Sequence, residues 1–293
     1  MDVVICMAAR DFRIVKKTIR GLRRYVINNS DTIYLITKSS NRRFFSGSWF
    51  VKKNIILVDE DSLVTGLTYN GLQEMVSKHF DYQVKAGWYL QQFLKMGFAE
   101  SEYANNNYLI WDSDTIPLRH IPMATSEGKC YLAAKTEYHK PYFDTMERLL
   151  GYGKQEDFSY IAEHMVIEVK YMRELIDIIR KAPIDGNTWF EKIINASSQT
   201  DVGTFSEFET YGSFCSKYHP GIFEIRQLRT LREAGMLFGH SVTQEELETL
   251  GRMGFDTASF ESYDVPFNHR GWINRFDRRL IKLINWYDKK FKK

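Results

Sequence analysis

Two aspartates separated by one serine, Asp112-Ser113-Asp114, directly follow a run of four apolar residues, Tyr108-Leu109-Ile110-Trp111. Such a run predicts a buried strand, and ligands of open α/β sheets bind beyond the carboxyl ends of the strands. Carboxylates at that place can bind a divalent cation, a hard ion that prefers oxygen ligands and bridges to phosphates. We therefore predict that Asp114 binds a metal and that Asp112 binds the metal or the ribose of a nucleoside diphosphate.

Two other interpretations of this pair stay open. It could be a surface turn in which Asp112 caps the next segment. The run from Asp112 to Ile116 also fits the signature of haloacid-dehalogenase-like phosphatases, in which the first aspartate is a nucleophile. That family usually carries the signature on its first strand, whereas about 110 residues precede it here, and no later pair of aspartates stands out as a magnesium site.

Two further pairs of residues are candidates for acid–base chemistry. Glu207 and Glu209 lie at an expected helix start, where a carboxylate can take the proton of an attacking hydroxyl group. Ser206 and Glu209 also have the spacing of a capping box, which leaves Glu207 as the better candidate base. Glu163 and His164 precede an expected strand and could contact an acceptor or transfer a proton, although an isolated histidine is often structural.

Candidates for binding the nucleotide come from two other regions. The first strand–helix junction contains Ala8, Arg10 and Asp11, which could reach a nucleotide base, although Asp11 could instead cap the helix. The helix expected after Gly87 carries polar side chains among large apolar ones, and the candidates from it are Trp88, Gln91, Gln92 and Lys95.

Taken together, these motifs resemble the GT-A glycosyltransferases, and more narrowly a bacterial group of small transferases of surface polysaccharide and lipopolysaccharide synthesis. The resemblance rests on the segments 87–95, 108–114 and 205–212 and reaches to about residue 240. It implies a nucleotide-sugar donor, commonly a UDP-sugar, Mn2+ or Mg2+ as cofactor, and a surface glycan or lipid-linked glycan as acceptor. A transferase fold that binds sugar nucleotides without turnover is the remaining alternative. The resemblance also implies a late histidine or aspartate as a third metal ligand, for which His219 and His240 are eligible and we favour His240. The clear late histidine motif of some retaining families is missing, which leaves the third ligand and the stereochemistry open.

The order of apolar runs predicts the fold class. Apolar strands separated by helical stretches are typical of βαβ units, so we expect an α/β, Rossmann-like GT-A domain with a mostly parallel sheet flanked by helices. Strands are expected at 3–7, 32–37, 54–59, 108–111, 130–134, 165–169 and 237–240, and helices at 13–26, 83–98, 171–181 and from 206.

Composition limits the class of protein further. The 293 residues include 44% hydrophobic and 26% charged residues, as in ordinary globular proteins. Three widely spaced cysteines give no zinc or disulfide pattern. The N-terminus lacks the features of a signal peptide, and no apolar run is long enough to span a membrane. We expect a cytoplasmic protein, with residues 1–267 as the catalytic domain.

The last residues, 268–293, differ from the rest in charge. From Arg270 onward there are nine Lys or Arg and two Asp, a charge of +7, so the remainder of the chain carries −4. This distribution argues against a general nucleic-acid-binding surface. Aromatic and leucine residues recur here at three- or four-residue steps, which predicts a basic amphipathic helix. That helix could bind an anionic membrane surface at the inner face of the cell membrane, or pack on its own domain.

Overall fold

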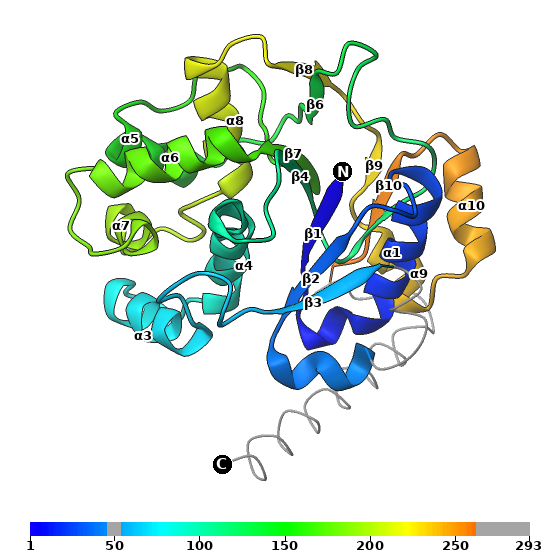
Figure 1. The fold of residues 1–293 in the computed structure, drawn as a ribbon, viewed down its shortest axis with the longest axis horizontal. Coiled ribbons are helices and arrows are strands. Elements are labelled where there is room, and N and C mark those ends of the chain that lie inside the picture. The colour runs from blue at the N-terminus through cyan, green and yellow to red at the C-terminus, as the bar shows by residue number, and fades with distance from the viewer. Residues whose placement is uncertain (46–53, 262–293) are drawn as a thin grey trace.

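The computed structural model describes residues 1–45 and 54–261, which form a central sheet with helices on both faces (Figure 1). The sheet has five strands in the order β3-β2-β1-β4-β7. β1, β2, β3 and β4 are parallel, and β7 pairs antiparallel with β4. Their bounds are β1 Asp2–Cys6, β2 Ile33–Thr37, β3 Ile55–Asp59, β4 Asn107–Trp111 and β7 His164–Glu168.

The strands form because their residues are apolar on both faces, as expected of a sheet that is covered on both sides. On β1, Val4 and Cys6 belong to one hydrophobic cluster, whereas Val3 and Ile5 belong to another on the opposite face. The alternation follows from the two-residue period of side chains along a strand. The core therefore consists of two layers of side chains separated by the sheet.

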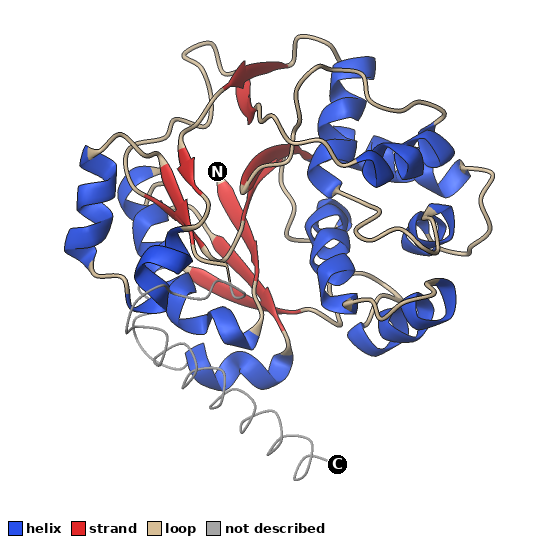
Figure 2. Cartoon of the chain, turned by 180° about the vertical axis from the view of Figure 1, so that it is seen from behind, coloured by secondary structure: helices blue, strands red, loops and turns tan. Residues whose placement is uncertain are grey.

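Within residues 1–45 and 54–261, six helices on one side of the sheet contribute to the first of these clusters and form one layer (Figure 2). They are α3 Tyr69–His79, α4 Ala86–Gly97, α5 Lys140–Leu150, α6 Val169–Lys181, α7 Trp189–Ala196 and α8 Glu207–Tyr218, with η3 (Phe98–Glu100) after α4. The opposite face is covered by η1 Ala9–Asp11, α1 Phe12–Tyr25 and η2 Ser39–Phe45.

Short strands extend the structure beyond β4. A three-stranded sheet has the order β5-β10-β9, and β6 pairs with β8. The bounds are β5 Thr115–Pro117, β6 Cys130–Ala133, β8 Phe223–Arg226, β9 Thr230–Leu231 and β10 Thr257–Ser259; the helical elements here are α9 Ala234–Phe238, η4 Gly239–Ser241 and α10 Gln244–Arg252. Of these elements, β5, β10, α9 and α10 pack with α1 in a third apolar cluster. Gly21 of α1 allows this approach, because a Cβ there would lie 2.9 Å from Pro117.

The predicted fold class, α/β with a mostly parallel sheet, is confirmed. The two strands whose carboxyl ends carry the predicted site, β1 and β4, are present. The helix predicted at 83–98 is α4. The strand predicted at 237–240 is wrong, because these residues belong to α9 and η4. A run of four apolar residues suits a buried helix as well as a strand.

The predicted tail, 268–293, and its domain boundary lie outside the described residues. Within the described ranges, every helix is too short or too polar to cross a membrane.

Candidate active site

The predicted aspartates lie where the strand order of the sheet reverses. From β1 the chain continues to β2 on one side, whereas β4 lies on the other side of β1. Such a switch point opens a crevice at the carboxyl ends of the two strands, and this is where open α/β sheets bind ligands. Ala8 to Asp11 follow β1, and Asp112 to Asp114 follow β4. A hydrogen bond from Ser113 Oγ to Asp11 Oδ2, at 3.4 Å, joins the two segments.

Lys95 joins two of the predicted carboxylates. Its Nζ donates to Asp112 Oδ1 and to Glu207 Oε1, at 2.8 Å in each case. The lysine side chain is only 4% exposed and that of Glu207 6%, whereas Asp112 is 31% exposed. Lys95 therefore links α4, the end of β4 and the start of α8 through one ammonium group.

The electrostatics of Lys95 are set by these two partners. Burial by itself would lower the pKa of Lys95, but the carboxylates of Asp112 and Glu207 raise it above its ordinary value. The ammonium group also lies 4.7 Å from the centre of the Phe208 ring. Lys95 was predicted to bind the donor; in the structure its charge is already engaged inside the protein.

Asp114 has the opposite surroundings. Burial raises its pKa well above the ordinary value, and the neighbouring carboxylates of Glu261, Asp11 and Asp112 raise it further. The pKa of Asp11 is also raised by burial, against the opposing charge of Arg10, whose Nε lies 3.7 Å from Asp11 Oδ1. This part of the site therefore carries an excess of negative charge.

Four hydrogen bonds fix the start of α8. Ser206 caps the helix by accepting a hydrogen bond from Glu209 N at 3.2 Å, and Gln92 Oε1 accepts one from Glu207 N at 3.1 Å. The Glu209 carboxylate does not complete the predicted capping box. Instead it accepts hydrogen bonds from Ser159 Oγ at 2.7 Å and from Tyr160 N at 3.0 Å. Glu209 thus binds a neighbouring segment, and Glu207 is left to face Lys95.

Glu163 lies beside Asp112 but is held by basic residues. Its backbone carbonyl accepts from Asp112 N at 2.9 Å. Its carboxylate lies 3.5 Å from Lys135 Nζ and 3.7 Å from Arg232 Nε. Glu163 is buried, and these two basic side chains and its carboxylate form a charged cluster.

His164 is buried and neutral. Its ring stacks on Trp111, with centroids 4.5 Å apart, and Arg226 Nη2 lies 3.4 Å from its Nε2. Burial, with Arg226 and Lys135 adding to it, lowers the pKa of His164 to about 3. A group with this pKa is a poor match for proton transfer near neutral pH, which leaves His164 a packing role in this structure.

The other predicted donor-binding residues are divided between the site and the protein interior. Ala8 and Arg10 are exposed at the end of β1. Gln92 is buried and bonded to α8, and Gln91 is half-buried, with its carbonyl near Cys6. Trp88 is half-buried and stacks on Tyr142, with ring centroids 6.4 Å apart.

The predicted metal ligands stay a prediction. Across residues 1–45 and 54–261, no three His, Cys, Asp or Glu side chains form a group that could hold a metal ion. His240 lies in η4, where its carbonyl accepts a hydrogen bond from Lys17 of α1 at 3.1 Å. His219, the other candidate, pairs with Glu174 at 2.8 Å on the surface of the helical layer.

The sequence did not point to several residues that complete the site. One of them is Tyr142. Burial is the main cause that raises the pKa of Tyr142 to about 12, and the charge of Glu207 is the next largest. Lys135, Arg226 and Arg232 surround Glu163 and His164. They are single residues in separate segments, and the pairing of β6 with β8 brings the segments of Lys135 and Arg226 together.

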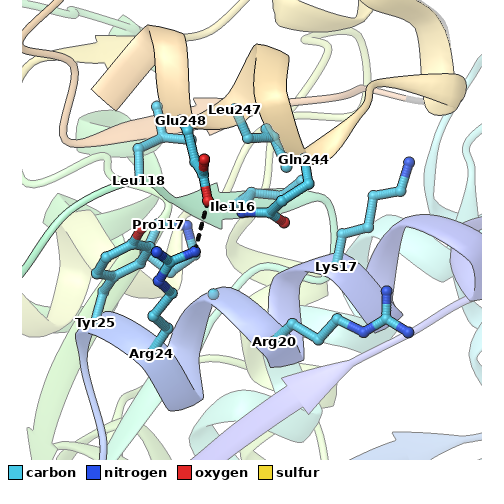
Figure 3. A pocket seen from close by; sticks show the side chains of 11 residues that line it. Lys17, Arg20, Arg24, Tyr25, Ile116, Pro117, Leu118, Gln244, Leu247 and Glu248 are labelled. Carbon is cyan, nitrogen blue, oxygen red and sulfur yellow. Dashed lines mark hydrogen bonds and ion pairs between the residues drawn. The ribbon is translucent and has the colours of Figure 1, made fainter. Parts of the chain in front are cut away.

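The structure also has a cavity away from this crevice. It has a volume of about 240 Å³ and lies between α1 and α10 (Figure 3). Lys17, Arg20 and Arg24 contribute to its lining, and Arg24 forms an ion pair with Glu248 at 2.8 Å. None of the predicted site residues lines it.

The fold and the site define an α/β protein with an acidic crevice at the switch point of its sheet. The chain belongs to a protein family described as "Family of unknown function (DUF6492)", whose model matches residues 7–247. No curated protein matches the chain.

Several solved structures are similar to the chain at low identity. An active-site mutant of LgtC has 11% identity and a TM-score of 0.48, with 96% of each chain covered. WbbM, a bifunctional glycosyltransferase, has 13% identity and a TM-score of 0.43 over 92% of this chain and 47% of its own. The glycosyltransferase GlyE of Streptococcus pneumoniae has 13% identity and a TM-score of 0.43 over 99% and 63%.

Proposed function

We propose that the chain is a metal-dependent glycosyltransferase that moves a sugar from a nucleoside diphosphate sugar, a UDP-sugar in the first instance, to a glycan acceptor. The observation that carries the proposal is the pairing of two carboxylates across Lys95. Asp112, at the predicted donor site, and Glu207, the predicted base, bind the same ammonium group at 2.8 Å each. A transferase needs a donor and an acceptor activated side by side.

The donor would lie over the ends of β1 and β4. Ala8, Arg10 and Asp11, which follow β1, would bind the nucleoside there, and Asp112, which is 31% exposed and follows β4, would lie beside it. Trp88 and Tyr142 offer aromatic faces on the α8 side, where a sugar ring can stack. Lys95 acts from inside the protein by holding Asp112 in place.

The acidic half of the site suits a divalent cation. Asp112 and Asp114 supply oxygen ligands, and the carboxylates around Asp114 leave negative charge for a cation to neutralise. Mn2+ or Mg2+ held by Asp112 and Asp114, with His240 as the predicted third ligand, would offset the charge that develops on the departing nucleoside diphosphate.

Glu207 would accept the proton of the attacking hydroxyl group if the reaction inverts the anomeric centre. The acceptor would be a bacterial surface glycan or a lipid-linked glycan, and residues 270–293 could bring the enzyme to an anionic membrane surface. These finer assignments follow from the resemblance to GT-A transferases and from the charge of the C-terminal segment.

The donor is tested by thermal unfolding of the full chain with UDP and related nucleotides, each with Mn2+ or with EDTA. We expect stabilisation only when metal is present, by about 2.7 kcal/mol at 100 times the dissociation constant. Asp114→Asn should abolish it, whereas Asp144→Asn, a surface variant in α5, should retain it. No stabilisation by any nucleotide would overturn the proposal, and metal-dependent hydrolysis of a generic phosphate ester would favour the phosphatase alternative.

The base is tested by the release of UDP from the best UDP-sugar in the presence of an acceptor. Glu207→Gln should lower kcat roughly 100- to 10,000-fold while UDP binding stays intact. Glu147→Gln, an exposed position on α5, is the matched control. A Glu207→Gln enzyme with unchanged kcat would remove Glu207 from the chemistry, and binding without any turnover in the wild type would favour an inactive sugar-nucleotide-binding protein.

A further inference from the structure

A second cavity lies beside β6 and β8, and Arg226 in its lining contacts His164. Its volume is about 520 Å³, within the range of small-molecule sites. Its lining combines basic, aromatic and apolar residues: Arg119, His120, Ile121, Pro122, Tyr131, Arg226, Leu228 and Asp256. None of the residues predicted to bind the donor or metal belongs to it.

Arg226 is the unusual group in this cavity. Its guanidinium donates to the carbonyl of Pro122, approaches Met123 Sδ at 3.6 Å and His164 Nε2 at 3.4 Å, and lies 5.0 Å from the centre of the Tyr131 ring. All of these partners are neutral. Across the described ranges no carboxylate forms an ion pair with Arg226, although arginine usually binds carboxylates or phosphates when it is partly buried.

The one carboxylate in the lining is already engaged. Asp256 Oδ1 accepts from Arg119 Nε at 2.5 Å, and Oδ2 accepts from the backbone N of Arg229 at 2.7 Å. The cavity thus holds two guanidinium groups and one carboxylate. Burial lowers the pKa of Arg226 to about 10, although Tyr131 and Asp256 act in the opposite direction.

We propose that this cavity binds an oxyanion, a phosphate or a carboxylate, carried by the acceptor glycan. The anion would pair with Arg226, and the face of Tyr131 beside it can support a sugar ring. The word acceptor rests on the proposed transferase function; the oxyanion site itself does not. The cavity lies close to the donor crevice, since His164 touches Arg226 on one side and stacks on Trp111, which precedes Asp112, on the other.

The site can be tested without a nucleotide. The full chain is titrated by calorimetry in EDTA with inorganic phosphate, with glucuronate and with glucose, at constant ionic strength. EDTA keeps the acidic crevice free of metal, so that an anion has no reason to bind there. We expect one of the two anions to bind and glucose to bind at least tenfold more weakly. Whether phosphate or glucuronate binds more tightly identifies the kind of oxyanion.

Three variants decide the assignment. Arg226→Gln should weaken anion binding roughly tenfold or more, because a charge-assisted hydrogen bond is lost, and Arg226→Lys should retain part of it. Arg229→Gln, an exposed arginine outside the cavity, should bind the anion like the wild type. Equal affinity in Arg226→Gln and the wild type, or no anion binding by the wild type, would overturn the proposal. Metal-dependent UDP binding, measured on the same Arg226→Gln protein, reports separately on the proposed function.

Discussion

Both sides of the acidic crevice contain aspartate and glutamate side chains, but the surroundings of these carboxylates differ. On the α4 side, Asp112 and Glu207 share the ammonium group of Lys95. On the β1 side, burial and the carboxylates of Glu261, Asp11 and Asp112 raise the pKa of Asp114, and the exposed Arg10 lies 3.7 Å from Asp11. The first arrangement pairs both carboxylates with a buried cation, whereas the second places carboxylates beside one another.

The comparison can be tested most severely by removing the lysine. We expect Lys95→Met to lower the free energy of unfolding by roughly 3–5 kcal/mol, because it leaves two carboxylates without their buried counter-ion. Lys140→Met is the control, since Lys140 forms an exposed surface pair with Asp144 and its loss should change the stability little. Urea unfolding measures both. Similar losses in the two variants would mean that Lys95 does not hold the site together.

A second test concerns His164, whose charged form is disfavoured by burial. Its pKa of about 3 lies below its ordinary value, so the unfolded chain binds a proton at acidic pH that the folded chain does not. Stability should therefore fall as pH drops below about 6.5, by roughly 2 kcal/mol at pH 5. His164→Phe keeps a ring on Trp111 and should lack this part of the pH dependence. Parallel loss of stability in the two proteins between pH 7 and pH 5 would contradict the assignment.

The smallest expected effect separates the two aspartates of the motif. Without metal, Asp112→Asn should cost about 1 kcal/mol, because Lys95 loses one charged partner. Asp114→Asn should cost nothing or stabilise the protein, because it removes one of several carboxylates that repel each other. Thermal unfolding in EDTA compares them directly. If Asp114→Asn is the more destabilised protein, the two sides of the crevice do not differ as described.

Much of the fold follows from local patterns in the sequence. The apolar run Tyr108 to Trp111 predicted β4, and the spacing of Ser206 and Glu209 predicted the start of α8. The patterns fail where two structures use the same residues, as at 237–240, or where a side chain has a choice of partners. Glu209 had the spacing of a capping box, but its carboxylate binds Ser159 and Tyr160, which lie far away in the sequence.

The candidate site was predictable in its position and less so in its connections. Asp112 and Asp114 could be placed because a strand ends at a known edge of the sheet. The role of Lys95 could not, because its second partner, Glu207, lies 112 residues along the chain. Arg226 gave no signal at all, since a single arginine shows its lack of a counter-ion only when the chain around it is folded.

The bridge at Lys95 also limits how the protein can move. One ammonium group on α4 holds both the end of β4 and the first turn of α8, so neither can shift without breaking an ion pair in a buried place. These three elements should therefore behave as a single rigid body on the timescale of turnover.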